Sequence, residues 1–263
     1  MMPPHWTPLV HEAGLASYCL GAGLASMRKA NFAEPKHYYG AFFEYTIGLE
    51  RVMKLALIVD HCVEHGAFPS NEKYAQRYGH RLTDLIAAIS GLHNKLDSSA
   101  RVWEIPSGPI AEAAISILSD FARGSRYYNI NVLTGKEPTA DPVALWFTEV
   151  GMPLLETRRR TPDVRWARLV DNEVGDRAQI RFTDATGAPL TSFEDLARMT
   201  RDSEFVAKES TFLCAKIARY TIATLCARAE QADHNLALPY FEEFFYALLI
   251  EDSKLKNRKT FML

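Results

Sequence analysis

The chain has 263 residues, of which 48% are hydrophobic and 24% charged, and its formal net charge is −2. This length can bury a substantial core, and the composition is that of an ordinary globular protein. The near-neutral charge excludes binding of nucleic acid through an overall positive charge, so any such contact must come from a local patch. No apolar run reaches the roughly 18 residues that a membrane span needs, so no membrane contact is expected.

The N-terminal residues lack the basic segment and apolar core of a secretory signal. Four cysteines form no C-x-x-C pair, and each lies in an apolar run typical of a helix: Cys19, Cys62, Cys214 and Cys226. We therefore expect buried, reduced thiols and a cytoplasmic protein.

Helical periodicity dominates the first half of the chain, where apolar residues recur at steps of three and four. Gly66 is placed to end the longest of these helices, and Gly124 to break the last. Within the longest helix, Glu50 precedes Lys54 by four residues, a spacing that favours an ion pair. The helices expected here cover about residues 13–27, 37–65, 78–96 and 109–123.

The second half is also mainly helical. Asp141 and Pro142 are typical of a helix N-cap followed by the first helical residue, and Ser192 with Asp195 resembles a capping box. The helices expected here run from 142 to about 156, from about 203 to 232, and onward from 239.

Residues 158–190 differ, because apolar residues alternate on both sides of Gly175. We expect a small β-hairpin near residues 164–183, as an insertion or a boundary. The predicted fold is all-α, a single helical domain over residues 1–263 built as an antiparallel bundle.

Three residues in this sequence match the H-x-x-E-H pattern of a zinc peptidase family: His61, Glu64 and His65. The pattern would place both imidazoles one turn apart on a helix. However, the sequence indicates no residue as the third ligand that a zinc site needs. Two histidines also suit the negative end of a helix dipole, so we expect no metal or other cofactor here.

Two other stretches carry chemistry. His80 follows Gly79 at a helix start, where a neutral imidazole able to accept a proton is favoured. In "SRYYNIN", Arg126 brings a planar cation, and Tyr127 and Tyr128 bring rings that could stack on a base. Structural roles, such as capping, core packing or an ion pair, remain the alternative for both stretches.

Five arginines surround one tryptophan in "TRRRTPDVRWAR", residues 157–168. This stretch is a candidate phosphate-binding patch, and a solvated linker is the alternative. The chain has no phosphate-binding loop of the G-x-x-x-x-G-K-[ST] type and no G-x-S-x-G element.

Taken together, "YGAFFEYTIGLERVMKLALI", "YGHRLTDLI" and "SRYYNIN" resemble the HEPN-like all-α proteins of bacteria. The resemblance covers about residues 37–133 and, through the "KNRKTF" tail, more weakly 203–261. It implies a helical bundle, often a dimer, linked to stress response, phage defence or toxin action, and we therefore expect a homodimer. The resemblance places a ligand site at His80 and Arg126. The ligand-binding residues expected beside them are Glu50, Lys54, Tyr127, Tyr128 and Asn129.

Three functions follow as expectations. The first is a binding or regulatory module that contacts RNA, a nucleotide or a partner protein. The second is a metal-independent ribonuclease, since many HEPN proteins use an arginine and a histidine with four to six residues between them. Arg228 and His234 match that spacing, so the base would be His80 or His234 and the phosphate clamp Arg126 or Arg228. The third is a metal-dependent hydrolase built on His61, Glu64 and His65.

Overall fold

The computed structural model describes residues 3–31, 34, 36–71, 73–137, 140–178, 180–184 and 187–261, with Asp176 described by its backbone only. The longer helices are α1 (Trp6–Arg28), α2 (Lys36–His65), α3 (Leu82–His93), α4 (Pro109–Arg123), α8 (Arg165–Val174) and α9 (Phe193–Glu230). Short helices are α5 (Tyr128–Leu133), α6 (Pro142–Trp146), α7 (Met152–Glu156), α10 (Glu242–Phe245) and α11 (Asp252–Asn257). The described residues form no strand, only two isolated bridges, so the all-α prediction is confirmed.

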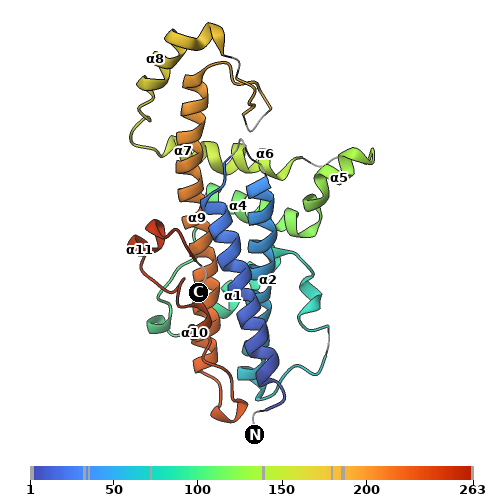
Figure 1. The fold of residues 1–263 in the computed structure, drawn as a ribbon. Coiled ribbons are helices and arrows are strands. Elements are labelled where there is room, and N and C mark those ends of the chain that lie inside the picture. Colours follow the sequence, from blue (N-terminus) through green and yellow to red (C-terminus); the bar gives the residue numbers. More distant parts are fainter. Residues whose placement is uncertain are drawn as a thin grey trace.

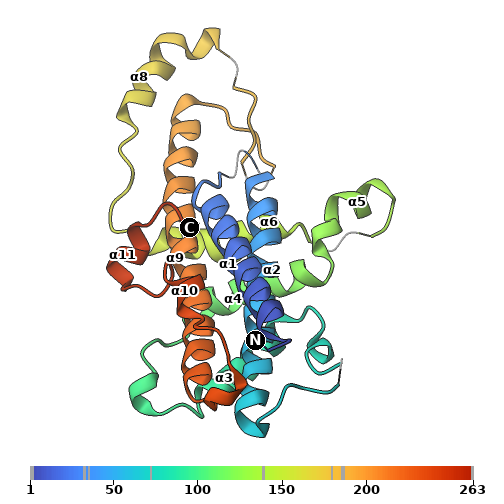
Figure 2. The same ribbon diagram turned by 60° about the horizontal axis from the view of Figure 1, so that its bottom comes forward.

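Helices α1, α2 and α9 lie side by side and form the centre of the molecule, as both ribbon views show (Figure 1, Figure 2). Glycines let the first two helices approach closely. A Cβ atom on Gly23 would lie 2.5 Å from the backbone nitrogen of Tyr45, and one on Gly48 would lie 2.6 Å from that of Leu20. The small residues that weaken α1 as an isolated helix are therefore what permits this contact.

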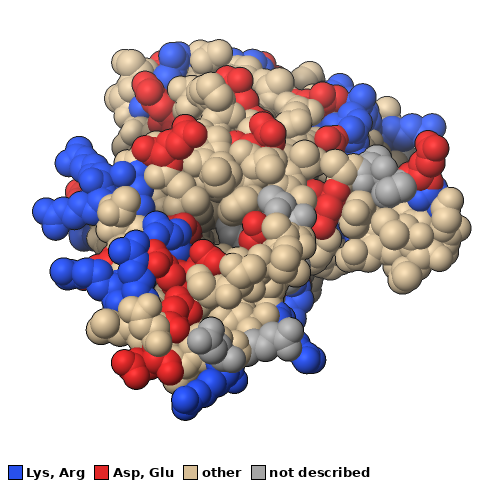
Figure 3. All heavy atoms as spheres, turned by 90° about the horizontal axis from the view of Figure 1, so that it is seen from above, with Lys and Arg blue, Asp and Glu red and all other residues tan. Residues whose placement is uncertain are grey.

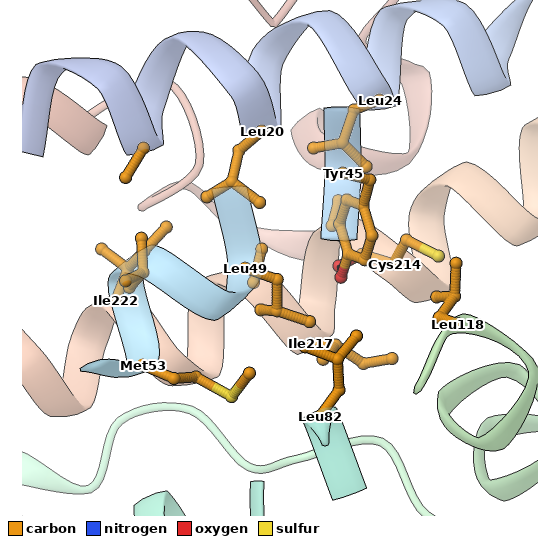
Figure 4. Close-up of a cluster of buried hydrophobic side chains, with 14 of the residues drawn as sticks. Leu20, Leu24, Tyr45, Leu49, Met53, Leu82, Leu118, Cys214, Ile217 and Ile222 are labelled. Atoms are coloured by element: carbon orange, nitrogen blue, oxygen red, sulfur yellow. The ribbon is translucent and has the colours of Figure 1, made fainter. Parts of the chain in front are cut away.

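The main core lies between these three helices and is closed from below by α3 and α4 (Figure 4). Leu20 and Leu24 point from α1 towards α2, and Ile217 and Ile222 reach in from α9. Tyr45 is fully buried, and its hydroxyl donates a 2.8 Å hydrogen bond to the carbonyl oxygen of Cys214. Burial of these side chains, rather than helix propensity, stabilises the arrangement.

Several predicted helix ends are confirmed. Asp141 caps α6 by accepting from the amide of Val143, and Ser192 caps α9 by accepting from Asp195. Gly66 has a φ of 66°, the left-handed conformation that follows a helix end. However, α9 begins ten residues before the predicted start, since the Ser192 cap already opens it.

The hairpin predicted near residues 164–183 is wrong. Residues 165–174 form helix α8, and residues 179, 185 and 186 lie outside the described part of the chain. Val164 and Ala167 pack on Ala197 in a small core of their own, separate from the main one. Val164 and Ala167 are three residues apart, which fits a helix, whereas the alternation of apolar residues also fitted a strand. The packing on Ala197 decides in favour of the helix.

The C-terminal part is less helical than predicted, because the expected apolar helix after residue 239 is reduced to the single turn of α10. All four cysteines are free and buried, as expected. Across the described ranges, no helix has the length and hydropathy required to cross a bilayer.

Candidate functional site

The α2 helix positions both parts of the candidate site. Phe43 and Glu50 are seven residues apart, almost two full turns, so their side chains share one face about 10 Å apart along the axis. The opposite face, including Tyr45, Leu49 and Val52, is buried in the core. This amphipathic pattern fixes which side of α2 faces outward.

The lower part of the site is an ion-pair cluster around Glu50. Its Oε1 accepts a 2.6 Å hydrogen bond from Nζ of Lys54, and its Oε2 lies 2.9 Å from Nδ1 of His80. The side chain of Glu50 is only 15% exposed, whereas that of His80 is 59% exposed. The structure thus brings together three of the predicted residues, and the i, i+4 pair is confirmed.

This geometry sets the tautomer of His80. Since the carboxylate can only accept, the proton of a neutral imidazole lies on Nδ1, and Nε2 carries a lone pair that has no partner among the described residues. His80 lies just outside α3, after Gly79, whose φ of 55° turns the chain there. A carboxylate-oriented histidine with an open nitrogen is the arrangement of a general base.

The upper part of the site is an aromatic cavity of about 540 Å³ between α1, α2 and the end of α4. Tyr39, Phe43 and Phe121 contribute rings to its wall. The guanidinium of Arg126 lies 5.1 Å from the centre of the Tyr127 ring, a cation–π contact. Phe43 is 45% exposed and Tyr127 50%, so apolar rings remain open to a ligand.

Arg126 has no ion-pair partner among the described residues, and its Nε is buried without a hydrogen-bond acceptor there. Glu44 lines the same cavity and interacts with the Cys19 thiol, whose pKa is raised to about 11 by burial and, secondly, by this carboxylate. The cavity therefore offers one free guanidinium, one carboxylate and several rings. This set suits an anionic ligand that has a flat, hydrogen-bonding portion.

Tyr39 anchors the other predicted residues of this region. Its hydroxyl donates a 2.8 Å hydrogen bond to Oδ1 of Asp141, and Asn129 hydrogen-bonds to it as well. Burial, followed by the nearby Asp141 carboxylate, raises the pKa of Tyr39. Tyr128 lies close enough to act on the same hydroxyl. Asn129 and Tyr128 thus support the wall rather than line the cavity.

His80 does not line the cavity that holds Arg126. The two parts are linked through α4, where the amide of Thr83 lies 3.5 Å from Oγ of Ser119, seven residues before Arg126. The site is therefore two neighbouring subsites along one face of α2. Sequence reasoning missed Tyr39, Phe43 and Glu44. The helical spacing from Glu50 marks Phe43, seven residues away, and Tyr39, eleven residues away, but gives no signal for Glu44.

The Arg228–His234 pair is arranged differently. Arg228 is 5% exposed and lies 2.6 Å from Oδ1 of Asp60 and 3.0 Å from Oε1 of Glu64. Since two carboxylates already neutralise this buried guanidinium, it is poorly placed to clamp a phosphate. His234 is exposed in a 3-10 turn beyond α9.

The three side chains of the H-x-x-E-H pattern also contact different partners and do not converge on one point. His61 and His65 stack on each other with ring centres 4.1 Å apart. Glu64 instead pairs with Lys95 at 3.2 Å and with Arg228, and these cations lower its pKa. Within the described ranges, no three histidine, cysteine or acidic side chains are grouped to hold a metal ion.

The arginine-rich stretch is largely neutralised by acidic neighbours. Arg158 pairs with Asp202 at 2.6 Å, and Arg168 pairs with Glu194 at 2.6 Å. Figure 3 shows positive side chains gathered at one edge of the molecule with acidic ones among them. The stretch therefore presents a mixed surface and not a continuous basic patch.

Comparison of the chain with protein-family models, with curated proteins and with solved structures gave no match.

Proposed function

We propose that this chain is a HEPN-like antiparallel helical protein whose task is binding, with a nucleotide unit, free or within single-stranded RNA, as its ligand. The observation that carries the proposal is the unpaired Arg126 guanidinium beside the half-exposed Tyr127 ring in the aromatic cavity. A base would stack on Tyr127 or Phe43 while Arg126 holds the phosphate. A role as a regulatory module of a bacterial defence or stress system rests on the resemblance alone.

Titration with adenosine and guanosine monophosphates and with a short single-stranded RNA tests this binding. We expect Arg126→Met to weaken binding at least about tenfold, because it removes the charge but keeps an apolar stem of similar length. The matched control is Arg160→Met, since Arg160 is exposed and has no ion-pair partner among the described residues. Equal loss for both variants would contradict a specific site.

The mononucleotides and the RNA distinguish the two sources of the ligand. If the ligand is a free nucleotide, the mononucleotides and the RNA should bind with similar affinity per site, and their affinity should depend little on salt. RNA as ligand predicts tighter binding of the longer strand and a steep fall with salt, because more phosphates release counterions.

A metal-independent ribonuclease is the second candidate, and the carboxylate-oriented His80 favours it. Here His80 would take the proton of the attacking 2′-hydroxyl, and Arg126 in the adjacent subsite would bind the phosphate. Incubation with RNA in EDTA tests this reaction. Cutting that survives both His80→Ala and Glu50→Gln would exclude His80 as the base.

A further inference from the structure

A second cavity, of about 480 Å³, lies away from the α2 site, where α7 passes beside α9. Figure 1 shows the loop before α9 returning towards this crossing, so three parts of the chain enclose it. One wall contains Phe147, the first residue of a π-helical turn (Phe147–Gly151). Such turns occur frequently at functional sites, and the volume is in the range of small-molecule pockets.

Ser203 sets this cavity apart. It is 2% exposed, lines the cavity, and its Oγ has no hydrogen-bond partner among the described residues. The other serines and threonines of α9 each donate to the carbonyl four residues back: Thr200, Ser210, Thr211, Thr221 and Thr224. Since that local bond is available to any helical serine, its absence at Ser203 points to a hydroxyl used by a ligand.

The charges around the cavity favour a cation. The charged side chains that line it are Asp184, Asp195, Asp202 and Arg198. Arg198 is neutralised by Glu194 at 2.8 Å, and Asp202 by Arg158. The Asp195 carboxylate accepts a 3.2 Å hydrogen bond from the Thr191 hydroxyl, and the Asp195 backbone amide donates to Oγ of Ser192. No cation pairs with this carboxylate in the described ranges. Asp184 accepts a hydrogen bond from the backbone amide of Ala188, so the carboxylate left for a ligand is that of Asp195.

We propose that this cavity binds a small amphipathic amine, with its ammonium group at Asp195 and a second polar group at Ser203. These residues are eight positions apart on α9, about 12 Å along the axis. Met152 and Met199 line the apolar space of the same cavity. The ligand class is thus an elongated primary amine with an apolar body and a hydroxyl or carbonyl at its far end.

Carbon-13 labelling of the methionine methyl groups tests the proposal by NMR. The probe is an eight-carbon amino alcohol with the amine and the hydroxyl at opposite ends. We expect it to shift the signals of Met152 and Met199, and not those of Met27 and Met53 in the main core. The hydroxy acid of the same length, which reverses the charge, should bind at least about tenfold more weakly.

Two variants separate the two contacts. Ser203→Ala should weaken binding of the amino alcohol about three- to tenfold and leave binding of octylamine unchanged, because only the amino alcohol has a polar group that can hydrogen-bond to the Ser203 hydroxyl. Asp195→Asn should weaken both amines alike. Ser203→Ala also removes an unpaired buried hydroxyl, so its Tm should be no lower than that of the unmodified chain.

The proposal is overturned if the amino alcohol shifts the signal of neither cavity methionine at millimolar concentration. Equal binding of the hydroxy acid would also overturn it, and so would unchanged binding in Ser203→Ala. None of these outcomes depends on the nucleotide site at Arg126.

Discussion

The two ends of α2 use arginine in opposite ways. Near its C-terminal end, Arg228 is buried against Asp60 and Glu64, and Lys95 lies beside the same carboxylates. Near its N-terminal end, Arg126 has a half-exposed ring beside it and no carboxylate paired with it in the described ranges. A buried guanidinium that carboxylates already neutralise has a structural role, whereas an unpaired charge in an open cavity is available to a ligand.

This contrast shows why residue type and spacing alone did not distinguish the two arginines. Arg228 and His234 have the spacing expected of a ribonuclease, yet the guanidinium is enclosed by carboxylates from another helix. Arg126 has no such spacing, yet its guanidinium is the unpaired one. Charge compensation therefore separates the two arginines better than sequence distance does.

The largest effect should follow from Arg228→Met. The variant leaves the Asp60 side chain, only 10% exposed, without its closest cation, although Lys95 remains 3.6 Å away. We expect a loss of about 3 kcal/mol in the free energy of unfolding, at the lower end for a broken buried pair. Urea denaturation measures it, and nucleotide binding at Arg126 should be unchanged. A loss of binding without a loss of stability would reverse the roles assigned to the two ends.

A matched double variant sharpens this result. In Asp60→Asn with Arg228→Met, both members of the pair are neutral, so the loss should be smaller than the sum of the two single losses. Additive losses would mean that the two groups do not stabilise each other.

A smaller effect is expected midway along α2. Glu50→Gln removes the carboxylate that accepts from both Lys54 and His80, and should cost about 1 kcal/mol because His80 is largely exposed. Nitrogen-15 NMR of the imidazole checks the geometry: the His80 proton should lie on Nδ1 in the unmodified chain and redistribute towards Nε2 in the variant. The control is Lys54→Met, which keeps the His80 contact and should leave its tautomer unchanged.

The fold was largely predictable because helical periodicity and capping residues are local signals. Asp141, Ser192 and Gly66 end or begin helices where their chemistry requires it. The exception was residues 164–183, since Val164, Trp166 and Val170 fit both a strand and a helix. Only the contact of Ala167 with Ala197, thirty residues further along the chain, distinguishes the helix from the strand.

The candidate site was predicted in part. The sequence placed Glu50 and Lys54 on one helical face and marked His80 and Arg126 as polar groups near helix ends. It could not show that Glu50 reaches His80, because this contact depends on how α3 packs against α2. It could not show the unpaired state of Arg126 either, because that depends on every acidic side chain the fold brings nearby.

The smallest effect concerns Glu64 at the C-terminal end of α2, and acid tests it. Lys95, followed by Arg228, lowers the pKa of Glu64 below its ordinary value of 4.5. The charged form is therefore favoured by folding, so its contribution is complete above pH 4.5 and is lost as the pH falls through the folded-state pKa. The gap in stability between the unmodified chain and Glu64→Gln should then be constant from pH 7 to about 5 and narrow below 4.5. Glu149→Gln is the control, since Glu149 is exposed and has no ion-pair partner among the described residues. A gap that stays constant into acid would mean that Glu64 does not share in neutralising Arg228, and that Asp60 alone compensates it.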